Sequence, residues 1–216
     1  MIPSNWPVPF LIDPQHLAVD AVVSFCVSVL LAVTINAEAQ AFAATFLGDS
    51  RTGDSRRFNF NCLAHLSLLG SICYLVGGFG WPRTVDVDRT KFKHPQAYMV
   101  ITRLAGPMAN LLLAGIVGSI VMIMKAVNSD PRVFLMLVGV NVTTAVYNLI
   151  ILPPMAAGVL VQEIIPPKLV TLRQLFRQAG PFLILALALL ERLRPGGIIS
   201  PYLNPLVMEV FNYIRG

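Results

Sequence analysis

Asn36 and Gln40 are the residues best placed to do chemistry within a long apolar run of this sequence. They lie four positions apart, so in a helix both side chains share one face, one turn from each other. Two histidines at that spacing can bind zinc, but amide side chains carry neither charge nor an imidazole lone pair and are poor zinc ligands. We therefore expect this pair to hydrogen-bond to a neighbouring segment.

The other nucleophilic and titratable residues do not complete a catalytic set. His16, His65 and His94 fall in separate parts of the chain, and Ser67 and Ser71 near His65 have no accompanying acid. A hydrolase that uses an activated nucleophile needs the nucleophile, its base and an orienting group together. His65 is therefore expected to satisfy polar neighbours within its own segment, and the three cysteines to be reduced packing residues.

Glu38 and Arg103 are charges inside apolar stretches, where a charge is costly unless it is paired or hydrated. Three arrangements are open. The two side chains pair with each other, each extends to the nearer membrane interface, or they contact a partner subunit.

Composition indicates a membrane protein. Of the 216 residues 56% are hydrophobic and 12% are charged, about half the charged share of a typical soluble domain. The net charge of +5 does not predict nucleic-acid binding, because the basic residues sit in short loops without interleaved aromatics. The first twenty residues hold no Lys or Arg, so we expect no cleaved secretory signal.

The apolar runs predict an all-α integral membrane protein, a bundle of about four to six transmembrane segments. A polar interval is expected at residues 163–178, and the alternating run TVDVD (84–88) predicts a short β-like cytoplasmic loop. The predicted division is a Pro-rich extracytoplasmic segment (1–20), a membrane core (21–158), and a cytoplasmic linker with two short apolar helices (159–216). The apolar runs are residues 21–47, 58–81, 104–124, 133–152, 179–190 and 198–214.

Basic residues orient the bundle only if residues 58–81 enter and leave the bilayer on the same side. If every run crosses, the basic residues divide almost evenly between the two sides. With a re-entrant segment, most of them fall on one side, and the positive-inside rule makes that side cytoplasmic. This topology places the N-terminus outside, with an expected location in the bacterial inner membrane. The basic residues that do not fall on the cytoplasmic side in this topology are Arg103, Lys125, Arg132, Arg192 and Arg194.

Three motifs in order resemble the site-2 protease family of intramembrane zinc proteases. NAEAQA (36–41), followed by FAATFLGD, stands where that family has H-E-x-x-H-A and then L-G-D. LAGPMAN (104–110) is similar to its G-P-x-x-N helix, and NLIILPPMAAG (148–158) to N-L-x-P-x-P-P-L-D-G-G. The linking segments FNFNCLAHLSLLG and GWPRTVDVD also resemble the family's. The positions shared with these motifs are Gly106, Pro107, Asn110, Asn148, Pro153, Pro154 and Gly158.

The chain departs from the family where the chemistry is done. The resemblance places Asn36 and Gln40 at the two zinc-binding histidines, Ala37 at the general base and Ala156 at the aspartate ligand. With all four changed, we expect neither zinc nor any other cofactor, and no zinc proteolysis at this site.

The resemblance therefore predicts an inactive relative that acts as an accessory subunit of a membrane complex or binds transmembrane segments. Its expected partners are other membrane subunits and lipid. Two alternatives stay open: an active hydrolase with an unrecognised site, and a conduit for a small molecule, lipid or ion. We further expect the vacated cleft to be dry, because alanine removes its charge.

Overall fold

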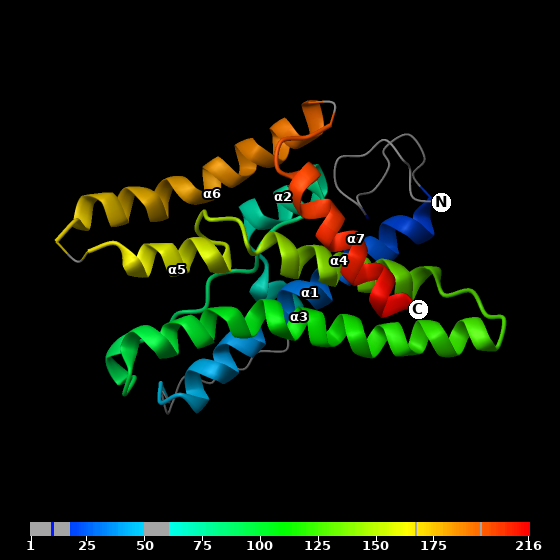
Figure 1. The fold of residues 1–216 in the computed structure, drawn as a ribbon, viewed down its shortest axis with the longest axis horizontal. Helices are drawn as coiled ribbons and strands as arrows, with labels where there is room; N and C mark the ends of the chain where they lie inside the picture. Colours follow the sequence, from blue (N-terminus) through cyan, green and yellow to red (C-terminus); the bar gives the residue numbers. More distant parts are fainter. Residues whose placement is uncertain (1–9, 11–17, 50–60, 167, 195) are drawn as a thin grey trace.

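The computed structural model of the protein describes residues 10, 18–49, 61–166, 168–194 and 196–216 (Figure 1). Within these ranges the regular structure is helical, as the apolar runs predict. The seven α-helices are α1 (Val19–Phe46), α2 (Leu68–Gly77), α3 (Pro95–Ala126), α4 (Arg132–Tyr147), α5 (Ala156–Ile164), α6 (Val170–Leu193) and α7 (Ser200–Arg215). Two 3₁₀ turns, η1 (Cys62–His65) and η2 (Arg89–Lys91), lie between them.

Helices α1, α3 and α4 pack against one another, each in contact with the other two (Figure 1). Long uninterrupted apolar runs make them helices, and their shared interior includes Phe25, Val121 and Val138, all fully buried. Helix α7 packs against α4 and α3, while α6 packs against α2 and α5. This arrangement brings residues from α1, α3 and the loop after α4 to one place.

Two of the described helices, α1 and α3, are long and apolar enough to cross a membrane. At 28 and 32 residues they extend roughly 42 and 48 Å. The span predicted at residues 133–152 is interrupted: α4 has 16 residues and ends at Tyr147, because the chain turns at Asn148. The structure thus supports two spans by length and composition, fewer than the four to six predicted.

The polar interval expected at residues 163–178 is largely helical. Helix α6 already begins at Val170 and continues through Pro181 to Leu193, so the first of the two predicted short segments is the second half of a 24-residue helix. The second predicted segment corresponds to α7. Polar residues did not interrupt α6 because Arg173 and Arg177, at helical spacing, share one face of it.

The TVDVD segment forms no strand, contrary to its alternating pattern. In the described chain the β pairing is one isolated bridge between Leu66 and Pro82. A strand needs the backbone of a neighbouring strand as its hydrogen-bond partner. Here the backbone N–H of Asp88 donates instead to the Asp49 carboxylate at 2.8 Å. Residues 84–88 therefore run as an extended loop over the end of α1 and across α3.

Helix α2 belongs to a hairpin that returns to its starting point. Its ten residues extend roughly 15 Å. Beyond it, Gly78 takes a positive φ of 76°, which reverses the chain. The Arg83 N–H then donates to the carbonyl of His65 at 2.7 Å, beside the Leu66–Pro82 bridge. Of the predicted segment 58–81, residues 58–60 lie outside the described ranges.

Candidate functional site

A ladder of three asparagines joins the central helices. Asn36 of α1 donates to Asn110 Oδ1 of α3 at 2.6 Å, and Asn110 donates to Asn141 Oδ1 of α4 at 2.9 Å. Asn110 also donates to the carbonyl of Ala32 at 2.9 Å. All three asparagines are buried, so each amide needs these partners. Asn141 was missed from the sequence because a single asparagine in an apolar run carries no motif.

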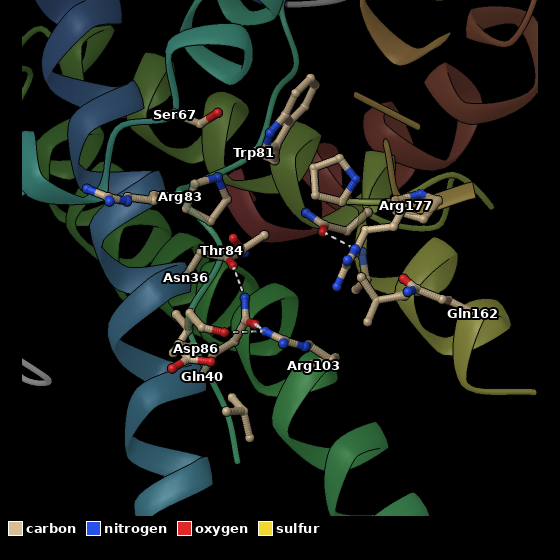
Figure 2. A pocket seen from close by; sticks show the side chains of 18 of the residues that line it. Asn36, Gln40, Ser67, Trp81, Arg83, Thr84, Asp86, Arg103, Gln162 and Arg177 are labelled. Carbon is tan, nitrogen blue, oxygen red and sulfur yellow. Dashed lines mark hydrogen bonds between the residues drawn. The ribbon is translucent and has the colours of Figure 1, made fainter. Parts of the chain in front are cut away.

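Arg103 and Gln40 extend this ladder toward a cavity (Figure 2). Gln40 Nε2 donates to Asn36 Oδ1 at 2.8 Å, and Gln40 Oε1 accepts from Arg103 Nη1 at 2.8 Å. Arg103 Nη1 also donates to the carbonyl of Val85 at 3.2 Å. The guanidinium is therefore held between α1 and the extended loop.

Gly106 makes this network possible. It lies one turn beyond Arg103 on α3 and faces the same side as Asn110. A Cβ at Gly106 would lie 2.4 Å from Asn36 Oδ1 and 2.9 Å from Gln40 Nε2, too close for either side chain to keep its place. The glycine of the GPMAN motif thus admits the two amides.

The loop after α4 positions Ala156. Asn148 donates to the carbonyl of Thr144 at 2.7 Å, and its Oδ1 accepts the N–H of Ala156 at 3.1 Å. The bond between Pro153 and Pro154 is cis. A Cβ at Gly158 would lie 2.0 Å from the carbonyl carbon of Leu152. The NLIILPPMAAG motif is therefore a tight, self-contained turn that begins α5 beside α3.

A cavity of about 600 Å³ lies at the meeting point of these elements (Figure 2). Asn36, Gln40 and Ala156 line it, so the structure brings together three of the four positions singled out in the sequence. Ala37 is fully buried and does not line it. The helix turn carries Ala37 away from the face that Asn36 and Gln40 share.

The cavity is polar and charged, which contradicts the expected dry cleft. Apart from Arg83 and Asp86 in the linking segment GWPRTVDVD, its charged lining comes from residues outside the sequence motifs. Beside Arg103, the charged lining residues are Arg83, Asp86, Arg89, Glu163 and Arg177. The alanines at positions 37 and 156 carry no charge, but the loop after α2 and helices α5 and α6 supply charged side chains.

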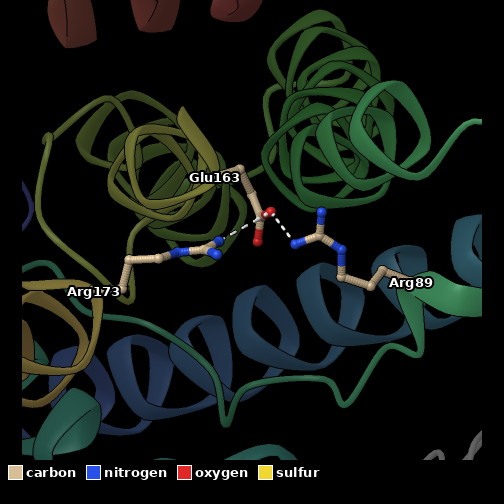
Figure 3. Close-up of polar contacts among 3 residues, drawn as sticks. All are labelled: Arg89, Glu163 and Arg173. Carbon is tan, nitrogen blue, oxygen red and sulfur yellow. Dashed lines mark hydrogen bonds and ion pairs between the residues drawn. The ribbon is translucent and has the colours of Figure 1, made fainter. Parts of the chain in front are cut away.

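Glu163 links three of these segments (Figure 3). Its Oε2 accepts from Arg89 of η2 at 2.7 Å and from Arg173 of α6 at 3.4 Å. Because Glu163 lies in the last turn of α5 and lines the cavity, these ion pairs close one wall of the cavity. The sequence separations are too long for any local pattern to reveal them.

Glu38 pairs with His65, which none of the three arrangements considered for Glu38 and Arg103 had included. The Glu38 Oε1 and His65 Nε2 atoms lie 2.9 Å apart, with both side chains largely buried. Glu38 lies two residues from Asn36 and therefore on another face of α1, away from Arg103. The pair joins α1 to η1, at the base of the α2 hairpin.

The residues at this site do not fit a zinc ion. Gln40 Oε1 and Asn36 Oδ1 already accept hydrogen bonds, and the donor to Gln40 is a guanidinium, a cation that repels a metal ion. Ala156 has no ligand atom. Elsewhere in the described ranges, histidine, cysteine and carboxylate side chains form no group of three that would hold a metal.

Comparison with known proteins supports a site-2-protease-like relationship. Over 150 residues the chain is 29% identical to a Bacillus subtilis (strain 168) protein that carries the name "Putative zinc metalloprotease YwhC". The alignment covers 65% of this chain and 68% of that protein. No family model matches the chain, and no solved structure matches it.

Proposed function

We propose that this chain is an inactive, site-2-protease-like membrane protein that acts as an accessory subunit and binds transmembrane segments of its partners. The observation that carries the proposal is the hydrogen bond from Arg103 to Gln40. It ties up one of the two side chains at the family's histidine positions and sets a cation where that family binds zinc. The neighbouring Ala156 supplies neither ligand nor base.

The proposed topology has a re-entrant α2 hairpin, cytoplasmic loops on both sides of it and the N-terminus outside, in the bacterial inner membrane. The bridge between Leu66 and Pro82 supports it, because a segment that crossed the bilayer would have its ends about 30 Å apart. The charge distribution supports the orientation. The loop from Arg83 to Lys93 is basic, as the positive-inside rule requires of the cytoplasmic side.

A groove between α1 and α3 is the proposed seat of a partner helix. Its volume is about 390 Å³ and its lining is apolar apart from Glu38. The small residues Ala39 and Ala109 face it, with Phe42 and Leu112 at its sides. Small residues let helices approach closely in lipid, where hydrophobicity does not drive association. The groove therefore favours a transmembrane helix over a water-soluble ligand.

Gentle extraction of the tagged full chain from its native membrane tests this proposal. We expect other membrane subunits in fixed proportion to the chain, and no cleavage of transmembrane substrates. Ala109→Phe, which fills the groove, should release them, whereas Ala186→Phe, at an exposed alanine of α6, should not. Recovery of the chain alone, or equal recovery with both variants, contradicts the proposed binding surface.

A further inference from the structure

Positive charge exceeds negative charge in the cavity. Four arginines and two carboxylates line it, an excess of two positive charges. One carboxylate, Glu163, is already shared between Arg89 and Arg173, outside the ladder of amides. The lining thus presents more guanidinium than its own acids neutralise.

Two of these arginines have donors left over. Arg103 Nε is buried and has no hydrogen-bond partner, although Nη1 of the same group is used twice. A buried guanidinium donor without a partner is costly, and a bound anion removes that cost. Arg177 of α6 makes no hydrogen bond or ion pair within the described chain, and its side chain is exposed.

We propose that the cavity binds a phosphate group through Arg103 and Arg177. Guanidinium groups bind phosphate oxygens through paired N–H donors, and a phosphate monoester carries close to two negative charges, which matches the excess in the lining. The volume of about 600 Å³ is in the range of small-molecule sites. The phosphate comes either from a phospholipid head group or from a soluble phosphate monoester.

The positions of the lining residues favour this ligand over a metal ion or an apolar helix. Gln40 holds Arg103 from one side and the Val85 carbonyl holds it from another, so its remaining donors are fixed before a ligand arrives. Fixed donors lower the entropy lost on binding. The same network that excludes zinc therefore prepares an anion site.

Trp81 provides a direct readout, since it is buried and lines the cavity. The full chain, carrying Trp6→Phe so that Trp81 is the sole tryptophan, is placed in phosphatidylcholine nanodiscs. Its fluorescence is titrated with inorganic phosphate and with glycerol 3-phosphate. In a second arm, part of the phosphatidylcholine is replaced by phosphatidic acid. Saturation in the first arm identifies a soluble source, and a response confined to the second identifies a lipid head group.

Arg177→Gln should lower the affinity for the probe that saturates by about tenfold or more, the effect expected on loss of a charge-assisted hydrogen bond. Its exposed side chain makes this variant safe for folding. Arg194→Gln, at an exposed arginine at the end of the same helix but outside the cavity, should bind like the parent. Arg103→Lys keeps the positive charge but loses the paired N–H donors of the guanidinium, and this variant should also bind phosphate more weakly.

Two results would overturn the phosphate site: no saturable response to any of the three probes, or equal affinity in the parent, Arg177→Gln and Arg194→Gln. Neither result depends on partner subunits or on proteolysis. The phosphate site can therefore fail while the proposed accessory function stands.

Discussion

Arg103 Nη1 lies 2.8 Å from Gln40 Oε1, and this hydrogen bond connects the GPMAN helix to the helix that resembles a zinc-binding one. Gln40 is hydrogen-bonded to Asn36, and Asn36 to Asn110, so the guanidinium is the last member of a chain of hydrogen-bonded amides. This site is held together by side-chain hydrogen bonds.

Replacing Arg103 should destabilise the protein. Arg103→Met keeps the apolar stem but leaves Gln40 Oε1 and the Val85 carbonyl without this donor, which costs about 1–3 kcal/mol for a buried group. The melting temperature in detergent should fall relative to Arg194→Met, a matched change at an exposed position. Equal melting temperatures would show that the network carries no stability.

Alanine substitutions at Gly106 and Gly115 should have opposite effects, although both lie on α3. A Cβ at Gly106 meets Asn36 at 2.4 Å, whereas one at Gly115 has no neighbour within 4 Å. Gly106→Ala should destabilise the bundle, and Gly115→Ala should be neutral or stabilising by about 0.5–1 kcal/mol, the helix preference of alanine. Thermal unfolding of the two variants, side by side, checks this; a loss at Gly115 as large as at Gly106 would contradict it.

The proposed topology makes a prediction for labelling from either side of the membrane. Single cysteines at Ser55 and Thr90, in a background without the three native cysteines, should react from the cytoplasmic side. Ser129→Cys, between α3 and α4, should react from the other side, because α3 is long and apolar enough to cross the membrane. Labelling of Ser55→Cys and Thr90→Cys on opposite sides would mean that the α2 hairpin crosses the bilayer.

Introducing the residues that the site-2 protease motifs have at positions 37 and 156, one at a time, should separate buried from cavity-facing positions. Ala37→Glu puts a carboxylate into a fully buried site away from the cavity and should lower stability strongly. Ala156→Asp faces the polar cavity, within a lining rich in arginine, and should be tolerated. Thermal melts in detergent compare the two. If Ala37→Glu is as stable as Ala156→Asp, the placement of Ala37 in the interior is wrong.

The sequence predicts the helices and the motif positions better than it predicts the cavity. Apolar runs led to α1 and α3, because helix formation depends on local residues, but the turn at Asn148 interrupts the span predicted at residues 133–152. Gly115 and Gly118 are three positions apart, a spacing of small residues that favours close helix contacts, but of these two only Gly118 approaches another helix, α7. Spacing defines a face of a helix and not what packs against it.

The charged lining could not be found from the sequence alone. Arg89 and Glu163 are 74 positions apart, and Glu38 and His65 lie in different elements, so no local sequence pattern links either pair. The alternation at TVDVD predicted a strand, but a pattern of period two does not reveal whether a neighbouring strand edge is present for pairing. Both the charged lining and the conformation of TVDVD depend on which distant segments lie beside these loops.

The zinc content of the purified full chain tests the central claim most directly. After metal-free purification and exposure to zinc followed by mild chelation, elemental analysis should find almost no zinc bound to the chain. The amides of Asn36 and Gln40 are engaged in hydrogen bonds, and Ala37 and Ala156 offer neither a ligand nor a base. Close to one zinc per chain, retained after chelation and lost in Gln40→Ala, would contradict the account.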